Sequence, residues 1–271
     1  MDAQLKEKVQ KVKKLLQNKK VLVAFSGGVD SSVVTRLAKE YCSKVIAATI
    51  ISELNPPSEL EEAERVAHEL NIEWRTIKIQ ELENPQFRAN PPNRCYYCKK
   101  DIMSALKKLA RHENVDIIID GTNADDLSDF RPGQLALKEF NIVSPLAQAD
   151  ITKEEIRKLA NFFGLSVHDK PAMACLASRI PYGEEITEKK LQMIAEAEKA
   201  IYELIHPKMV RVRYHGNGAR IEVLPEERSK FFDIEKIEQI VKILKRLGFI
   251  YVMLDLQGYR TGSLNEPLDS S

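Results

Sequence analysis

A segment rich in serine and glycine, SGGVDSS at residues 26–32, has the composition of a loop that binds phosphate. It follows the apolar run Val21–Phe25 and precedes a stretch with helical spacing, so we expect it to connect a buried strand to a helix. Its two glycines let the backbone turn sharply and expose N–H groups, and the start of the helix adds the positive end of its dipole. Ser26, Ser31 and Ser32 add hydroxyl donors. The Lys-Ser/Thr pair of the Walker motif is missing, and the alternative interpretation is a plain glycine turn.

Three cysteines are the second set of residues suited to chemistry. Cys95 and Cys98 form a C-x-x-C pair where a proline-rich loop meets a predicted helix, and Cys175 follows 77 residues after Cys98 in a segment without periodicity. In a reducing compartment, metal binding or catalysis is a better first hypothesis for such residues than a disulfide. The pair alone is also compatible with two half-buried cysteines at the start of a helix.

A zinc site is a further interpretation of the C-x-x-C pair, because His112 or His168 could supply an additional ligand. The fourth cysteine, Cys42, lies on the predicted helix over residues 31–42. We expect it to pack in the core, as most buried cysteines do.

A basic hairpin is the third candidate. Arg211 and Arg213 alternate with apolar residues on one predicted strand, and Arg220 and Glu222 do so on the next, across the turn at 216–218. The pattern fits the solvent face of a half-buried hairpin. It also fits a clamp for phosphate and carboxylate, for which forked guanidinium groups are well suited.

The elements that position these residues alternate along the first half of the chain. Apolar or alternating runs predict strands at 21–25, 45–51, 73–79 and 115–120, and helical spacing predicts helices at 4–18, 31–42, 58–70 and 96–111. Such alternation predicts an α/β fold with a doubly wound parallel sheet. Ligands bind beyond the carboxyl ends of the strands in these sheets, so the loop at 26–32 and the loop starting at Gly121 should converge on one site.

The composition changes after a predicted helix at 152–163, which begins with a Thr-x-x-Glu capping pattern. Residues 166–184 lack periodicity; a helix at 187–205, the hairpin, a helix at 234–247 and a strand at 250–256 follow. We therefore predict a nucleotide-binding domain over 1–165, a cysteine-bearing connecting segment over 166–186 and a small α/β domain over 187–271.

Composition narrows the function classes. The 271 residues carry 41 Lys and Arg against 40 Asp and Glu, and this near-neutral balance favours a small-molecule substrate over nucleic acid. The charged first residues do not resemble a signal peptide, and the apolar runs are too short to cross a bilayer. We expect a cytoplasmic protein with no membrane partner.

SGGVDSS resembles the PP-loop of the ATP pyrophosphatases, which share an adenine nucleotide alpha hydrolase-like fold and cleave ATP between its α and β phosphates. The resemblance implies ATP and Mg²⁺ as cofactors, with Asp125 beside the phosphates or the metal ion and the end of the strand at Thr49 and Ile51 beside the adenosine. It implies that the pyrophosphate end is bound by the loop residues Ser26, Gly27, Gly28, Asp30, Ser31 and Ser32.

Further segments resemble one subfamily, the LarE sulfur transferases: 93–99, 121–126, 174–183, 212–223 and 255–266. The resemblance spans nearly the whole chain. It implies a reaction in the biosynthesis of a nickel-pincer cofactor, in which the carboxylates of pyridinium-3,5-biscarboxylic acid mononucleotide are adenylylated and converted to thiocarboxylates. It also implies sulfide or another sulfur donor as a partner.

The LarE resemblance leaves two versions of sulfur delivery open. In one, Cys95, Cys98 and Cys175 hold a [4Fe-4S] cluster whose fourth iron lacks a protein ligand and can bind hydrosulfide. In the other, Cys175 gives up its own sulfur. All three cysteines are present, which favours the cluster.

The same resemblance implies roles for four residues outside the phosphate loop. It places Arg211, Arg213 and Glu222 near the substrate phosphate or at subunit contacts of a homo-oligomer, and Arg179 facing the anionic substrate. A PP-loop tRNA thiolase is a rival enzyme that would share the loop and the cluster. A sensor that only binds nucleotide is the rival outside catalysis, and it should release no AMP or pyrophosphate with any carboxylate.

Overall fold

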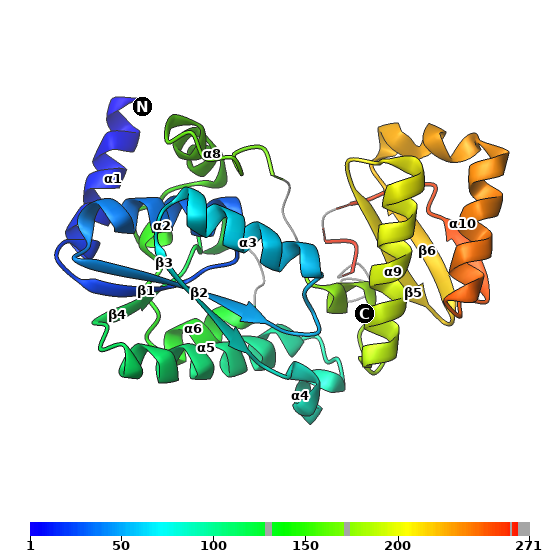
Figure 1. Ribbon diagram of the computed structural model, residues 1–271, viewed down its shortest axis with the longest axis horizontal. Coiled ribbons are helices and arrows are strands. Elements are labelled where there is room, and N and C mark those ends of the chain that lie inside the picture. Colours follow the sequence, from blue (N-terminus) through cyan, green and yellow to red (C-terminus); the bar gives the residue numbers. More distant parts are fainter. Residues whose placement is uncertain (128–131, 171–173, 261, 265–271) are drawn as a thin grey trace. The chain divides into compact units, whose positions relative to one another are not determined.

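The computed structural model describes residues 1–127, 132–170, 174–260 and 262–264, which form two compact units (Figure 1). The first unit comprises Met1–Asn84 and Asn93–Met173, and the second comprises Pro85–Pro92 and Ala174–Ser271. Of the 255–266 segment, residues 261, 265 and 266 lie outside the described residues.

The first unit is built on a four-stranded sheet in the order β3-β2-β1-β4. Every strand pair in it is parallel, as the alternation of strands and helices predicts. In the register of the central pair, Val21 lies opposite Val45. The strands are β1 (Lys20–Ala24), β2 (Lys44–Ile51), β3 (Glu73–Lys78) and β4 (Ile117–Ile119).

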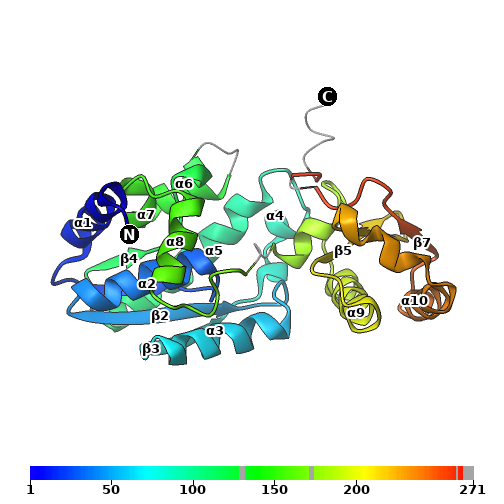
Figure 2. The same cartoon turned by 90° about the horizontal axis from the view of Figure 1, so that it is seen from above.

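Helices cover both faces of this sheet, so the α/β fold with a parallel sheet is confirmed (Figure 2). Val21 and Val23 face one core, whereas Leu22 faces the other, because successive side chains of a strand point to opposite faces. Burial on both faces explains why β1 is apolar throughout after its first residue. One face carries α1 (Ala3–Leu16), α2 (Val29–Tyr41), α3 (Pro57–Glu69), α7 (Pro145–Gln148) and α8 (Lys153–Phe162); the other carries α5 (Arg94–His112) and α6 (Gly133–Glu139).

The predicted irregular loop at 80–94 contains two short helical turns, η1 (Glu81–Glu83) and α4 (Pro85–Arg88). Its later part belongs to the second unit because Asn90, which is fully buried, donates from its side-chain amide to the carbonyls of Pro181 (2.7 Å) and Glu184 (2.9 Å). This long-range pairing cannot be seen in the local composition of the loop.

The second unit contains a three-stranded sheet in the order β5-β6-β7. The predicted hairpin is present, with β5 and β6 antiparallel, and Gly216 and Asn217 at its turn both adopt positive φ, as a tight two-residue turn requires. β7 pairs parallel to β6. The strands are β5 (Val210–His215), β6 (Gly218–Val223) and β7 (Tyr251–Leu254), and the helical elements are η3 (Leu176–Arg179), α9 (Glu188–Ile205), η4 (Pro225–Phe232) and α10 (Ile234–Arg246).

The chain passes between the two units after residues 84, 92 and 173, and the last of these points lies inside the predicted connecting segment 166–186. Among the described residues, no helix is both long and apolar enough to cross a membrane.

Candidate functional site

The serine- and glycine-rich loop runs from the end of β1 into the first turn of α2. Gly27 has a φ of +71°, and a Cβ placed on it would lie 2.7 Å from the Cα of Ala63 in α3. Only glycine fits this position, because both the backbone conformation and the space exclude a side chain. The turn leaves the backbone N–H groups at the start of α2 at the carboxyl end of the parallel sheet, where anions bind.

The three serine hydroxyls shape this loop. Ser31 Oγ donates to the carbonyl of Gly28 (3.0 Å) and lies 3.2 Å from Ser26 Oγ. Ser32 Oγ donates to the same carbonyl at 2.8 Å. Ser31 and Ser32 are buried, whereas Ser26 is exposed and accepts from the N–H of Gly28 at 3.3 Å. The serines therefore fix the conformation of the loop by their own hydrogen bonds, and Ser26 is the exposed member of the three.

The loop after β4 meets the phosphate loop, as the topology predicts. A Cβ placed on Gly121 would lie 2.8 Å from the backbone nitrogen of Ser31 and 3.0 Å from the carbonyl carbon of Asp30. Beyond Gly121, the η2 turn (Asp125–Leu127) carries Asp125, whose N–H donates to the side chain of Asn123 at 2.9 Å.

Lys153 joins the two acidic residues predicted for this site, although the sequence analysis did not single it out. Its backbone N–H donates to Asp125 Oδ2 at 2.7 Å, and its ammonium group pairs with Oδ2 of Asp30 on the phosphate loop. The Thr152 capping box places Lys153 in the first turn of α8. The capping pattern in the sequence predicts that a helix starts at this point. It does not predict that Lys153 pairs with Asp30, which lies 123 residues earlier in the chain.

Asp30 Oδ1 is buried and has no hydrogen-bond partner in the described structure. An uncompensated carboxylate oxygen is costly to bury unless it binds a cation or a donor. Carboxylate oxygens beside phosphate groups are the ligands that Mg²⁺ prefers. Asp30 and Asp125 are therefore suited to hold Mg²⁺ together with the phosphates of ATP.

The two residues predicted beside the adenosine lie on β2, but polar groups of both already form hydrogen bonds within the protein. The hydroxyl of Thr49 donates to the carbonyl of Phe25 (2.8 Å) and accepts from the indole N–H of Trp74 (2.9 Å). The carbonyl of Ile51, at the end of the strand, accepts from Ile79. The hydroxyl of Thr49 therefore serves the packing of the sheet, and the sequence could not show this because Phe25, directly after β1, and Trp74, on β3, are distant from it in the sequence.

Cys95 and Cys98 lie in the first turns of α5, three residues apart, so that they share one face of the helix. Cys95 is exposed and Cys98 is half-buried. Cys98 Sγ donates to Glu81 Oε1 at 3.0 Å, and burial raises the pKa of Glu81, which is only 2% exposed. Two thiols on one face, one of them accessible, suit a soft metal centre.

Cys175 belongs to the second unit, where it is half-buried directly before η3. None of the four cysteines forms a disulfide. Within the described parts of the chain, no group of three or more His, Cys, Asp or Glu side chains is placed to hold a metal ion.

The histidines considered for a zinc site do not join the C-x-x-C pair. His112 ends α5, which puts it about 25 Å along the helix from Cys95 at 1.5 Å per residue. The ring of His168 contacts the carbonyl of Leu165 and the carboxylate of Asp169. Cys42 packs against the core as predicted, and burial raises the pKa of its thiol to about 11.

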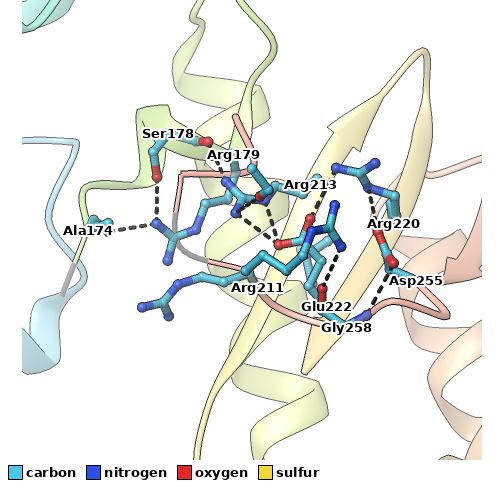
Figure 3. A network of polar contacts seen from close by, with 12 residues as sticks. Ala174, Ser178, Arg179, Arg211, Arg213, Arg220, Glu222, Asp255 and Gly258 are labelled. Atoms are coloured by element: carbon cyan, nitrogen blue, oxygen red, sulfur yellow. Dashed lines mark hydrogen bonds and ion pairs between the residues drawn. The ribbon is translucent and has the colours of Figure 1, made fainter. Parts of the chain in front are cut away.

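The predicted arginines of the hairpin form a buried polar network in the second unit (Figure 3). Arg213 Nε donates to Glu222 Oε2 at 2.9 Å, and Arg213 also donates to the carbonyl of Ser178 at 2.8 Å. The other oxygen of Glu222 accepts from Arg220 at 3.1 Å. Arg213 and Glu222 are thus 8% and 1% exposed and paired with each other, so the face predicted for solvent or for a ligand is instead largely internal.

Arg211 differs from its neighbours because, among the described residues, it forms no ion pair or hydrogen bond with a carboxylate. It is 9% exposed, and the hydrogen bond that its guanidinium makes is to the carbonyl of Val210 at 3.0 Å. Burial lowers the pKa of Arg211, and the positive charges of Arg179 and Arg213 lower it further, whereas the negative charge of Glu198 partly offsets them. A buried cation among other cations is stabilised by an anion.

Arg179 is predicted to face an anionic substrate, but its guanidinium is directed at the protein. It pairs with Glu198 on α9 and donates to the backbone of residues 174 and 175 and to Ser178. Only 3% of its surface is exposed, and the hydrogen bonds of its guanidinium among the described residues are to protein groups.

Residues 1–105 match the NAD synthase family. The chain is 42% identical over 250 residues to an uncharacterized protein of Synechocystis, covering 92% of this chain and 93% of that protein. It is 36% identical over 251 residues to the pyridinium-3,5-bisthiocarboxylic acid mononucleotide synthase of Lactiplantibacillus plantarum, covering 92% and 90%. It is also 30% identical over 191 residues to the tRNA-specific 2-thiouridylase MnmA of Halothermothrix orenii, covering 56% and 53%.

Proposed function

This chain belongs to the LarE family of ATP-dependent sulfur transferases in the PP-loop superfamily, and we propose that it converts the carboxylates of pyridinium-3,5-biscarboxylic acid mononucleotide to thiocarboxylates. The observation that carries the proposal is the arrangement around the phosphate loop, where Asp30, Asp125 and Lys153 meet the N–H groups at the start of α2.

The first half of the reaction activates a carboxylate. A substrate carboxylate oxygen attacks the α-phosphorus of ATP, the bond to the β-phosphate oxygen breaks, and pyrophosphate leaves. Asp30 and Asp125 would hold the Mg²⁺ that offsets the charge of the departing pyrophosphate. The loop N–H groups and the Lys153 ammonium are placed to bind it.

The second half replaces AMP with sulfur. Hydrosulfide sulfur attacks the acyl carbon, the acyl–phosphate bond breaks, and AMP leaves with its electron pair. Arg211 binds the phosphate of the substrate mononucleotide, because among the described residues it is the buried hairpin arginine without an ion pair to a carboxylate. The chain acts on a small molecule in a homo-oligomer in the cytoplasm.

Cys95, Cys98 and Cys175 would hold a [4Fe-4S] cluster, for which thiolates are the ordinary ligands. When bound, the cluster supplies an iron that keeps hydrosulfide deprotonated. The exposed thiol of Cys95 and its position one turn from Cys98 support this assignment.

Anaerobic purification with iron and sulfide quantitation, on the wild type and on Cys95→Ala, tests the cluster. We expect about four irons per wild-type chain and a marked loss in Cys95→Ala. A wild type without iron, in which turnover converts Cys175 to dehydroalanine with the loss of H₂S, would leave the sacrificial route. Release of AMP and pyrophosphate with the pyridinium dicarboxylate mononucleotide, and not with tRNA, tests the substrate.

A further inference from the structure

The backbone carbonyl of Cys175 accepts three hydrogen bonds. The donors are the N–H of Ser178 (3.0 Å), the hydroxyl of Ser178 (2.8 Å) and the guanidinium of Arg179 (3.1 Å). The same guanidinium nitrogen donates to the carbonyl of Ala174 at 2.7 Å. A carbonyl oxygen has two lone pairs, so the backbone around Cys175 is saturated with donors.

Arg179 is itself anchored on its other edge. Its Nε donates to Glu198 Oε1 at 2.8 Å and its second terminal nitrogen donates to Oε2 at 3.2 Å. This two-pronged pair is buried, since the side chains of Arg179 and Glu198 are 3% and 14% exposed. Forked pairs of this kind fix geometry as well as charge.

Glu198 also ties this arrangement to the arginine hairpin. Its Oε1 accepts the backbone N–H of Val212 at 2.9 Å, and Val212 lies on β5 between Arg211 and Arg213. A second tie comes from Arg213, which donates to the carbonyl of Ser178 at 2.8 Å (Figure 3). The segment that carries Cys175 and the strand that carries Arg211 are thus joined at two points.

The segment needs this support because η3 is only four residues long. Short 3₁₀ turns have poor hydrogen-bond geometry and little stability of their own. A buried ion pair adds little net stability over an apolar pair, but it can specify one arrangement.

We propose that Arg179 and Glu198 are positioning residues that hold Cys175 in register with the anion-binding Arg211. The inference rests on the proposed function, in which Cys175 takes part in sulfur delivery and Arg211 binds the substrate phosphate. It assigns to Arg179 a role in placing the cysteine rather than in contacting substrate.

Two variants of the full-length protein test this, Arg179→Lys and Glu198→Gln, each with hydrogen exchange followed by mass spectrometry and with product analysis. We expect amide exchange in peptides spanning 174–180 to rise at least about tenfold and thiocarboxylate formation to fall about 10- to 100-fold, since small misplacements of reacting groups have effects of that size. Pyrophosphate release in a single turnover at saturating mononucleotide should stay within about twofold of the wild type, because Asp30, Asp125 and Lys153, the residues proposed for activation, all lie in the first unit. The matched control is Arg228→Lys, since Arg228 also donates to two backbone carbonyls of the same unit, those of Pro225 and Leu256, and it should change neither readout.

Wild-type exchange at 174–180 in both variants would overturn the proposal. So would an equal loss of single-turnover pyrophosphate release and thiocarboxylate formation. If Arg179→Lys does not fold, the measurements on Glu198→Gln test the proposal by themselves. We expect Glu198→Gln to fold because glutamine keeps the size of glutamate and one of its acceptor oxygens. A wild type that forms no AMP with the dicarboxylate would contradict the proposed function, while the exchange data would still test the placement of Cys175.

Discussion

Gly121 and Ser31 are 90 residues apart in the chain, yet a Cβ added to Gly121 would lie 2.8 Å from the backbone nitrogen of Ser31. The loop that follows β4 is therefore in direct contact with the start of α2. This contact brings the acidic residue of one loop and the N–H groups of the other to the same end of the sheet.

Replacing Gly121 with alanine should destabilise the first unit by about 1–3 kcal/mol, because the new methyl group meets backbone atoms that cannot move aside. Urea denaturation measures the change. The matched control is Gly28→Ala, since Gly28 has a φ of −79° and its Cβ would lie 3.4 Å from Ser26 Oγ. Equal stability of both variants and the wild type would show that the two loops are not in contact.

Removing the ammonium group of Lys153 should slow activation rather than unfold the protein. In Lys153→Met we expect AMP formation to fall about 10²- to 10³-fold, as when one donor to a developing charge is lost. Stability should change by less than about 1 kcal/mol, because the ion pair is partly exposed. Lys158→Met is the control, since Lys158 pairs with Glu154 on the same helix. A full rate of AMP formation in Lys153→Met would rule out its role at the pyrophosphate.

Arg211 and Arg213 should respond oppositely to truncation. Arg211→Met removes a buried cation that lacks a carboxylate partner, so the free energy of unfolding should stay equal or rise, while KM for the mononucleotide rises at least about tenfold. Arg213→Met leaves Glu222 buried with Arg220 as its remaining partner and should lower the free energy of unfolding by about 1–3 kcal/mol. Thermal denaturation and substrate titration measure both. An unchanged KM in Arg211→Met would refute the assignment of the phosphate to Arg211.

Cys42 should resist alkylation at pH 8. Burial raises the pKa of its thiol to about 11, and the thiolate is the reactive form, so only about one thiol in a thousand is ionised at that pH. The rate of modification should therefore increase tenfold per pH unit from pH 8 to pH 10, whereas that of a small-molecule thiol levels off earlier. Peptide mass spectrometry after timed iodoacetamide treatment measures it. Levelling off near pH 9 would mean that the thiol is not buried in solution.

The local spacing of residues in the sequence was sufficient to predict the strands and helices and the chemistry of the phosphate loop. The run Val21–Phe25 followed by SGGVDSS, and the alternation of strands and helices after it, determine a parallel sheet with a phosphate loop at its edge, because each signal depends on residues within one or two turns of each other. The hairpin around Gly216 was predictable for the same reason.

Only the tertiary structure decided which polar side chains are engaged and which are left to bind a ligand. Lys153 pairs with Asp30 across 123 residues, and Arg179 pairs with Glu198 on α9. Arg211 and Arg213 look alike in the sequence, yet one has a carboxylate partner and the other does not. The free energy of burying a charge depends on what surrounds it in space, and that is settled when distant segments pack together.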